Sequence, residues 1–563
     1  MANFDLITIA IFSIIVVVCG LAFSGSGKNM KSFFAGGGAV PWWISGLSLF
    51  MSFFSAGTFV VWGAIAYKFG WVAVGIQWTM CIAGFLIGFV FAPKWQKTGV
   101  LTAAEFITRR LGYNTQKIYS YLFLFLSIFT TGVFLYPVAK IMQVSTGIPV
   151  ALTTIILGLL IIAYTAVGGM WAVVVTDVLQ FIVLTAAVFI VVPLSFGKIG
   201  GISAFIQKAP EHFFSFFNHE YSIGFLIAFA FYNLFYLAGN WAYVQRYTTV
   251  KTPKDAKKVG WLFGCLYIIS PLIWMLPPMI YRIVNPGLNG MEPEGAYLMM
   301  CKVALPVGML GMILGAMIFA TSSSVNTTLN ISAGVFTNDL YKHFFPRSSE
   351  KKLVKVARYS TLAFGVFTIV VALLVPFMGG IVEVVLSIGA ITGAAMFLPP
   401  LWCLFSKWQT GTSVLTVTII TLVANLFLKL VCPYVFDFAL SRSMEMIVGV
   451  GIPIILLMLY ELKFKLVPTE NIGYEKYLKL SSLKIPETYE EQIQTDVNNR
   501  HGRKVISLGI IFIALLIIII GFKTIQSAVI ILITGLLILI LGIVMNPRKK
   551  SNVVVSHDVK LKN

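Results

Sequence analysis

Residues 311–330 read GMILGAMIFATSSSVNTTLN, an apolar run that continues directly into a row of hydroxyl and amide side chains. Serine and threonine hydroxyls each carry a donor and acceptor lone pairs, and an asparagine amide adds a carbonyl oxygen. Inside hydrocarbon such groups must bond to their own helix, to a neighbouring helix, to water or to an ion. The stretch therefore predicts a membrane-spanning helix whose polar side is either a packing surface or a binding site.

The composition places the whole chain in a membrane. Its 563 residues are 58% hydrophobic and only 11% charged, with a mean hydropathy of +0.91. A soluble domain is about one quarter charged. The apolar runs are long rather than short and alternating, which predicts helices and not a membrane barrel. The net charge of +20 is scattered over predicted loops, so we interpret it as a topology signal and not as a nucleic-acid surface.

The residue types that carry enzyme or metal chemistry do not cluster. The six cysteines form no CxxC pair, which argues against a disulfide framework or a metal site. The five histidines fall in predicted loops or tails. A membrane enzyme needs convergent acid, base or metal groups, and a channel needs a continuous pore with polar rings. Neither pattern is found, so the sequence predicts neither an enzyme nor a channel.

Apolar stretches of roughly 20 residues predict the membrane spans. We place about fifteen of them, at 5–23, 41–67, 71–92, 117–143, 149–166, 170–196, 221–245, 260–283, 303–336, 355–376, 381–405, 412–432, 443–462, 505–521 and 524–546. The last two could instead form one re-entrant hairpin. The N-terminal segment lacks a basic region and a cleavage site, which predicts a retained first span and not a signal peptide.

Basic residues concentrate in alternate loops, which we expect to face the cytoplasm. They are Lys28 and Lys31; Lys94, Lys97, Arg109 and Arg110; Arg246, Lys251, Lys254, Lys257 and Lys258; Lys342, Arg347, Lys351 and Lys352; and the tail NPRKK at 546–550. This arrangement predicts a multi-pass protein of the plasma membrane, or the inner membrane of a Gram-negative cell. Its N-terminus would lie outside and its C-terminus in the cytoplasm.

Two predicted spans are interrupted at comparable places. Ser55-Ala56-Gly57 breaks LSLFMSFFSAGTFVVWG at 47–63, and Ala238-Gly239-Asn240 breaks FYNLFYLAGNWAYVQR at 231–246. Each break opens a block of five spans. Paired breaks in two five-span blocks are typical of an inverted repeat that binds substrate and ions at unwound backbone. Chance is the alternative, because glycine is common in membrane helices.

The polar run and one acidic residue are the candidate site residues. On a helix, Ala320, Ser323, Ser324 and Thr327 share one face. Such a row could direct oxygens at a hard cation such as Na⁺, or could bond back to its own helix as a packing face. Asp177 lies about two turns inside the span that contains VVVTDVLQ. An ionisable residue at that depth predicts a functional site, with a structural hydrogen bond as the alternative.

Four segments carry a family resemblance, and their order and spacing match as well. They are SFFAGGGAVPWWISGLSLFMSFFSAGTF, YTAVGGMWAVVVTDVLQ, NLFYLAGNWAYVQRYTTVKTPKDAKK and ATSSSVNTTLNISAGVFTNDLYK. The chain resembles the sodium:solute symporters, the family that includes sodium/glucose and sodium/sialic acid cotransporters. The resemblance implies an all-α, polytopic, LeuT-like core of five plus five helices in an inverted repeat. Extra N- and C-terminal helices would flank that core.

The resemblance also implies one sodium site and leaves a second one open. The shared site would use the carbonyls of Met51 and Phe54 and, from the polar run, Ala320, Ser323 and Ser324. Some members hold a second sodium ion, at positions that match Asp177, Ser323, Asn326 and Thr327 here. Asn326 stands where those members have a serine.

The implied substrate residues are Ser55, Thr58, Gln77, Asn233 and Tyr236, with Tyr236 at an aromatic inner gate. Phe53 stands where sugar carriers of the vibrio type have a polar amide. The span at 117–143 lacks the mid-span arginine that clamps a carboxylate in the sialic acid carriers. We therefore expect a neutral polyhydroxy solute, a sugar, polyol or sugar derivative, with a small amino acid or carboxylate as the alternative.

Together these features predict a sodium-coupled secondary symporter that works by alternating access, with Na⁺, a small solute and the lipid bilayer as its partners. A solute sensor is a more distant alternative. The predicted organisation is an N-terminal helix and loop (1–40), a first repeat (41–196), an external loop (197–220), a second repeat (221–405), two further helices (406–462), a cytoplasmic loop (463–504), a C-terminal hairpin (505–546) and a tail (547–563).

Overall fold

The computed structural model is built of helices throughout the residues that it describes, which are 3–22, 40–100, 102–165, 170–467, 473–475, 477–478, 489–524 and 527–547. Lys28, Lys31 and most of the basic tail lie outside these ranges. Within them, eleven helices are long and apolar enough to cross a membrane, and a bent pair makes a twelfth if it is counted as one span. Each of the fifteen predicted spans coincides with a helix or a broken helix.

The first half of the chain forms the helices in and around the first predicted repeat; η marks short π-helical or 3-10 segments. They are α1 (Asn3–Leu21), α3 (Trp42–Met51), η1 (Thr58–Trp62), α4 (Gly63–Phe69), α5 (Val72–Leu86), η2 (Ile87–Phe91), α6 (Ala92–Lys97), α7 (Ala103–Leu111), α8 (Tyr113–Thr146), α9 (Val150–Thr165), α10 (Met170–Ile199) and α11 (Ile202–Lys208).

The second half continues with the helices of the second predicted repeat and the C-terminal additions. They are α12 (Ile223–Gly239), α13 (Trp241–Thr248), α14 (Pro253–Trp274), α15 (Leu276–Val284), η3 (Glu292–Gly295), α16 (Ala296–Ala304), α17 (Met309–Gly334), η4 (Val335–Tyr341), α18 (Lys342–Phe344), α19 (Glu350–Leu374), η5 (Val375–Met378), α20 (Ile381–Trp402), α21 (Gly411–Leu426), η6 (Phe427–Val431), α22 (Cys432–Val435), α23 (Arg442–Leu466), α25 (Tyr489–Phe522) and α26 (Ala528–Met545).

Both predicted interruptions are present. The first separates α3 from η1 and α4. The second separates α12 from α13, which are bent by 63° relative to each other. Asn240 sits at this bend in an extended conformation, and its side-chain oxygen accepts a hydrogen bond from the amide of Ala242. The asparagine thus ends one helix and caps the next, because its short side chain satisfies an amide that has no partner in the first helical turn.

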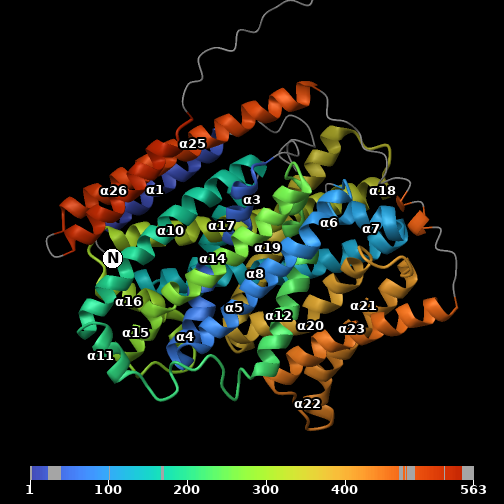
Figure 1. Cartoon of the computed structure of the whole chain (residues 1–563), viewed down its shortest axis with the longest axis horizontal. Coiled ribbons are helices and arrows are strands. Elements are labelled where there is room, and N and C mark those ends of the chain that lie inside the picture. The colour runs from blue at the N-terminus through green and yellow to red at the C-terminus, as the bar shows by residue number, and fades with distance from the viewer. Residues whose placement is uncertain are drawn as a thin grey trace, which may run out of the picture.

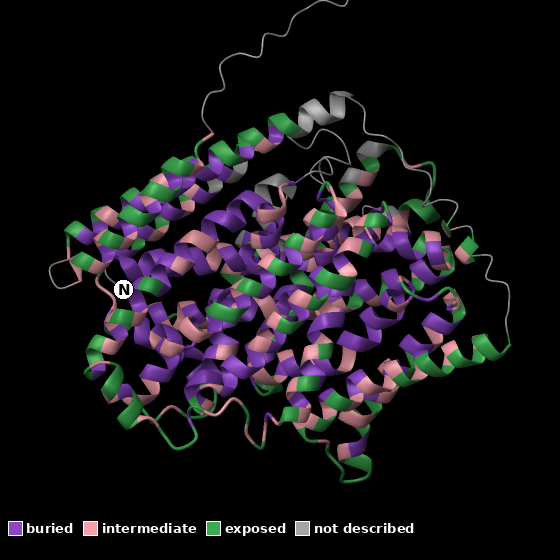
Figure 2. Ribbon diagram, in the orientation of Figure 1, coloured by how far each residue is buried: buried purple, intermediate pink, exposed green. Residues whose placement is uncertain are grey.

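The buried centre of the molecule is formed by the helices of the two predicted repeats (Figures 1 and 2). Close approach of α12 to α20 depends on two glycines. A Cβ atom at Gly239 would lie 2.9 Å from the carbonyl oxygen of Phe397, and one at Gly393 would lie 2.1 Å from the ring of Tyr232. Because glycine has no side chain, the two helices can touch at these positions, as small residues allow at membrane helix interfaces. The second break therefore packs directly against α20.

Peripheral helices cover the centre on two opposite edges. Helices α1, α25 and α26 lie together at one edge, and α21, α22 and α23 lie at the other (Figure 1). Asp5 of α1 accepts hydrogen bonds from the amides of Gly308, at 2.7 Å, and Gly311, at 3.2 Å. Its carboxylate thus caps the N-terminus of α17, where free amides and the helix dipole favour negative charge.

The structure differs from the sequence-based expectations in where the predicted loops lie. Many of the basic residues predicted in loops lie in helices, and two of them are buried: Arg110 is 1% exposed in α7 and Arg246 is 2% exposed in α13. Arg110 donates to the carbonyls of Ser406 and Gln409, so short helices at the ends of spans bury guanidinium groups against backbone oxygens. The segment predicted as a loop at 463–504 is partly taken up by α23, which ends at Leu466, and by α25, which begins at Tyr489.

Candidate functional site

The break after α3 redirects backbone hydrogen bonds and releases two carbonyls. The amide of Ser55 donates to the Thr58 hydroxyl at 3.3 Å, and the amide of Thr58 donates to the Ser55 carbonyl at 3.0 Å. In a continuous helix these two amides would bond to the carbonyls of Met51 and Phe54. Both carbonyls predicted to bind sodium are therefore released from their helical partners by the local sequence.

A threonine from the polar run holds this break against α17. The amide of Ala56 donates to the hydroxyl of Thr321 at 3.1 Å, and Thr321 is completely buried. One turn further on, the hydroxyl of Ser324 lies 3.4 Å from the carbonyl of Ala320, a long hydrogen bond. The unwound segment and the polar face of α17 are therefore neighbours. Thr321 was not among the predicted site residues, although it belongs to the same run.

Some of the residues predicted to bind sodium line a cavity beside the break, which we call the inner cavity. Ser52, Asp177, Ser324 and Thr327 all contribute to its wall. The side chains of Ser323 and Asn326 lie outside the described part of the structure, so their predicted roles stay predictions. Helix α8 adds Ser127 and Thr130, and α17 adds Thr328, so the described wall of the cavity contains several hydroxyl residues.

Asp177 is connected to a buried arginine through one serine. The hydroxyl of Ser48, on α3, donates to Asp177 Oδ2 at 2.6 Å and accepts a hydrogen bond of 3.4 Å from the guanidinium of Arg246. Arg246 also donates to the Ala242 carbonyl at 2.9 Å. Among the described residues that line the inner cavity, Asp177 and Arg246 are the two that carry charge. Sequence reasoning missed Arg246 because an arginine at the end of a span is also a topology signal.

A second cavity contains most of the predicted substrate residues. It encloses about 930 Å³, part of it open to the outside, and Ser55, Thr58, Asn233 and Tyr236 all line it. Gln77, the fifth, is buried on α5 but does not line this cavity. Aromatic side chains make much of the wall: Phe53, Trp62, Phe134, Phe229, Tyr232, Tyr236 and Tyr267. The described lining residues include no charged side chain.

The threonine hydroxyl hydrogens in this cavity are already engaged. Thr58 donates to the Phe53 carbonyl at 2.6 Å, and Thr392 donates to the Ile388 carbonyl at 2.7 Å. The amide nitrogen of Asn233 donates to the Thr79 hydroxyl at 2.8 Å, which turns its carbonyl oxygen to other partners. The cavity thus offers acceptor oxygens and tyrosine hydroxyls beside broad aromatic faces. Such a wall suits a neutral solute that has both hydroxyl groups and an apolar face.

An aromatic layer separates the two cavities. Four residues line both of them: Thr130, Phe134, Tyr236 and Thr392. On α8, α12 and α20, the residues that line one cavity lie about one helical turn from the residues that line the other. The Tyr236 ring centroid lies 6.2 Å from that of Phe53, 5.6 Å from that of Tyr243 and 5.3 Å from that of Phe397. Tyr236 thus lies among aromatic rings between the two cavities, and its role as a gate stays a prediction.

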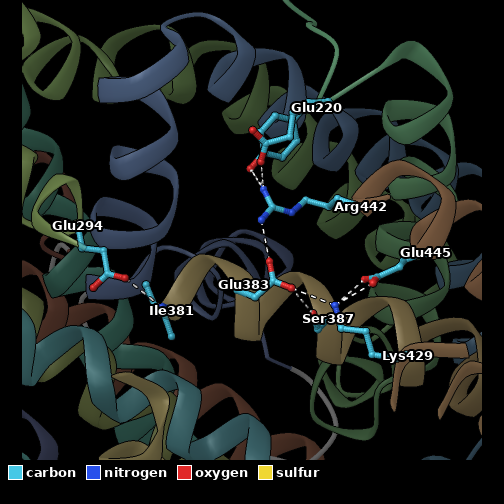
Figure 3. Close-up of polar contacts among 9 residues, drawn as sticks. Glu220, Glu294, Ile381, Glu383, Ser387, Lys429, Arg442 and Glu445 are labelled. Atoms are coloured by element: carbon cyan, nitrogen blue, oxygen red, sulfur yellow. Dashed lines mark hydrogen bonds and ion pairs between the residues drawn. The ribbon is translucent and has the colours of Figure 1, made fainter. Parts of the chain in front are cut away.

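Charged residues fix the end of α20 that lies beyond the second cavity. Glu383 lies between two cations: Oε2 accepts from Arg442 at 2.7 Å, and Oε1 accepts from Lys429 at 3.0 Å (Figure 3). Arg442 also pairs with Glu220, and Lys429 with Glu445. These contacts attach α20 to η6 and α23, which lie outside the two predicted repeats.

Comparisons with known proteins identify the family of this arrangement. Residues 33–420 match the profile of the sodium:solute symporter family. The sodium/glucose cotransporter of Vibrio parahaemolyticus is 29% identical over 469 residues, covering 76% of this chain and 85% of that protein. The sodium/myo-inositol cotransporter 2 of Mus musculus is 27% identical over 402 residues, 64% of this chain and 59% of the mouse protein. The sodium/sialic acid symporter of Proteus mirabilis is 26% identical over 377 residues, covering 64% of this chain and 75% of that protein.

One solved structure has a similar fold. The substrate-bound outward-open state of a Na⁺-coupled sialic acid symporter superposes with a TM-score of 0.69 and 23% identity, covering 82% of this chain and 98% of the other. The expected all-helical LeuT-like architecture is thereby confirmed.

Proposed function

This chain belongs to the sodium:solute symporter family, and we propose that the solute it carries with sodium is a sugar, a polyol or a sugar derivative. The observation that carries the proposal is the second cavity, which combines seven aromatic side chains with hydroxyl and amide oxygens and has no charged residue among its described lining. A sugar ring has an apolar face that packs on aromatic rings and hydroxyl groups that need buried polar partners. Relatives named for glucose and myo-inositol support the same class of solute.

Sodium would bind at the break, beside the solute. The proposed ligands are the carbonyls of Met51, Phe54 and Ala320 with the hydroxyls of Ser323 and Ser324. Release of the first two carbonyls from helical bonds supports this assignment. A hard cation needs several oxygen ligands, and unwound backbone is where such carriers place them. Sodium is thus a co-substrate that moves with the solute.

The proposed cycle is alternating access between two repeats, 41–196 and 221–405, with the N-terminus outside. In this orientation the second cavity leads outward and the inner cavity leads to the cytoplasm. Tyr236, with Phe53 and Tyr243, closes the path between them. Sodium and solute raise each other's affinity, because coupling between two sites is reciprocal.

Thermal unfolding of the purified full-length protein tests this proposal. Its melting temperature would be measured with glucose, galactose, myo-inositol, sialic acid and small amino acids, each in Na⁺ and in K⁺. We expect a hexose or an inositol to raise the melting temperature only in Na⁺. A rise with amino acids or sialic acid alone would favour the carboxylate alternative, and equal rises in Na⁺ and K⁺ would contradict coupling.

A matched variant connects any rise to the second cavity. Asn233→Leu keeps the size of the side chain and removes its carbonyl oxygen from the wall. We expect this variant to lose the rise caused by the solute and to keep the rise caused by Na⁺ alone. A solute effect that survives Asn233→Leu at full size would place the solute elsewhere.

A further inference from the structure

We propose that Trp95 is a positioning residue for transport, which holds the second break in place and thereby keeps the path between the two cavities closed. The inference rests on the proposed function, because the gate at Tyr236 belongs to the proposed cycle. Trp95 lies on α6 and is 2% exposed. Its indole Nε1 donates a hydrogen bond of 2.7 Å to the carbonyl of Ala238, two residues after Tyr236.

The second break frees two carbonyls, and side chains from two helices bond to them. In a continuous helix these carbonyls, of Leu237 and Ala238, would accept from amides four residues further along the chain. At the bend between α12 and α13, the Ala242 amide donates to a side chain instead. Trp95 supplies the donor for Ala238, and the Tyr247 hydroxyl, on α13, donates to Leu237 at 3.2 Å. Leu237 and Ala238 are both completely buried, and a buried carbonyl without a donor is costly, so both bonds stabilise the bent backbone.

The two breaks therefore differ in how their freed carbonyls are used. At the first break, the carbonyls of Met51 and Phe54 lose their helical partners and are the proposed sodium ligands. At the second break, the freed carbonyls accept hydrogen bonds from an indole and a phenol of the protein itself. The first break is thus the one proposed to bind an ion, whereas the second is held by side chains alone.

Neighbouring helices keep Trp95 itself in position. Its ring lies edge to face against Phe106 of α7, with the two centroids 5.0 Å apart. Arg110, one turn further along α7, donates to two backbone carbonyls that follow the end of α20. Helix α20 also packs directly against the second break. The bond from Trp95 to Ala238 therefore completes a frame of α6, α7 and α20 around the break.

This frame determines where two gate residues stand. Tyr236 precedes the Ala238 carbonyl and lines both cavities, and Tyr243 follows it and lines the inner cavity. Their ring centroids lie 5.6 Å apart. Opening the path requires these rings to separate, which moves the backbone between them. The bond from Trp95 opposes that movement, because it ties this backbone to α6.

Labelling of a cysteine in the inner cavity tests the inference on the purified full-length protein. Ile331, on α17, lines the inner cavity and not the second one. Ile331→Cys therefore reports access to the inner cavity through its reaction with a hydrophilic maleimide, measured by mass spectrometry of that peptide. In this background Trp95→Phe keeps an aromatic ring and removes the donor, and we expect labelling at position 331 to become roughly three- to tenfold faster, as the loss of one hydrogen bond implies. Tyr247→Phe removes the other donor and should act in the same direction.

Trp78→Phe is the matched control. Trp78 belongs to the same span as Trp95, lines neither cavity, and donates to the Ile268 carbonyl of α14 at 3.1 Å. We expect its labelling rate to stay within about twofold of the Ile331→Cys protein, because the bond that it loses lies away from the break. Equal acceleration by Trp78→Phe, or none by Trp95→Phe, would overturn the inference.

Tyr247→Phe decides the question if Trp95→Phe does not fold, since an unchanged labelling rate in that variant would also overturn the inference. Labelling requires no solute. A failure of the proposed function, seen as absent sodium-driven uptake by the wild type, is therefore distinguished from a failure of this inference.

Discussion

At the scale of single residues, the hydroxyls of the polar run have different tasks although they are adjacent in sequence. Ser322 donates to the Ile318 carbonyl of its own helix at 2.7 Å, which is a packing role. Thr321 accepts from the amide of Ala56 in the break. Ser324 lines the inner cavity and makes only a long bond of 3.4 Å to Ala320. Among the hydroxyls of the proposed sodium site that the structure describes, that of Ser324 is therefore the best placed to bind an ion.

Replacing Ser324 by alanine should weaken sodium binding without unfolding the protein. A polar contact with a charged group contributes about 1.5–3 kcal/mol, which corresponds to roughly a tenfold or larger loss of sodium affinity. The sodium concentration that half-saturates the rise in melting temperature measures this effect. Ser322→Ala is the matched control, and we expect its sodium affinity to stay within about twofold of wild type. Equal losses in both variants would contradict a specific role for Ser324.

Single residues also mark the limit of what the sequence predicts. Asp177 could be identified because an acid is rare within an apolar span. Its partner Arg246 could not, because an arginine six residues after a predicted break resembles any basic residue at a span end. Only the packing of α13 against α3 brings it to Ser48. Thr321 lies off the predicted face by one position, and the approach of the break to α17 is what selects it.

At the scale of helices, the break after α3 depends on a bond from another helix. The amide of Ala56 donates to Thr321, and both residues are buried. Thr321→Val keeps the shape of the side chain and removes the acceptor, which leaves a buried amide unpaired at a cost of about 1–3 kcal/mol.

The expected result for Thr321→Val is a lower melting temperature together with weaker sodium binding, since the released carbonyls of Met51 and Phe54 lose their support. Both are measured by thermal unfolding over a series of sodium concentrations. Thr321→Ser keeps the hydroxyl and should behave like the wild type. A valine variant with unchanged sodium affinity would show that the break holds its shape alone.

Glu294 joins three elements at the same end of the molecule as the Glu383 contacts. Its carboxylate accepts from the amide of Ile381 at 3.0 Å (Figure 3), at the start of α20, and from the hydroxyl of Tyr136, on α8, at 2.9 Å. Burial raises the pKa of Glu294 above its ordinary value of 4.5, although these bonds and the charges of Lys140 and Lys68 oppose the rise. The folded protein therefore holds a proton on Glu294 more tightly than the unfolded chain does.

The sign of the resulting pH dependence follows from that difference. The contribution of Glu294 to stability is fully present below pH 4.5 and is lost as the pH rises through the raised pKa of the folded state. We expect the melting temperature of the wild type, relative to Glu294→Gln, to fall by on the order of 1–3 °C over that range. Thermal unfolding of both proteins as a function of pH measures this. A difference that rises with pH would mean that the hydrogen bonds from Ile381 and Tyr136 outweigh burial.

At the scale of the whole molecule, hydropathy alone predicted the span positions, and each has a helical counterpart. The reason is physical, because a span must satisfy its own backbone and show apolar side chains to lipid. The packing of those spans was less accessible from sequence. An apolar face looks the same whether it meets lipid or protein, so the docking of α1 on α17 through Asp5 gave no signal in the composition. The break positions were predictable because glycine, serine and asparagine interrupt a helix locally.

The central claim is that a sodium gradient drives the uptake of a neutral polyhydroxy solute, and uptake into proteoliposomes tests it most directly. Purified protein would be reconstituted, and uptake of labelled glucose and myo-inositol would be measured with an inward Na⁺ gradient, with an equal K⁺ gradient and with Na⁺ equal on both sides. The account predicts transient accumulation of at least one of the two solutes above its external concentration under the Na⁺ gradient alone, and its loss in Asn233→Leu. Accumulation under the K⁺ gradient, or none of either solute under the Na⁺ gradient, would contradict it.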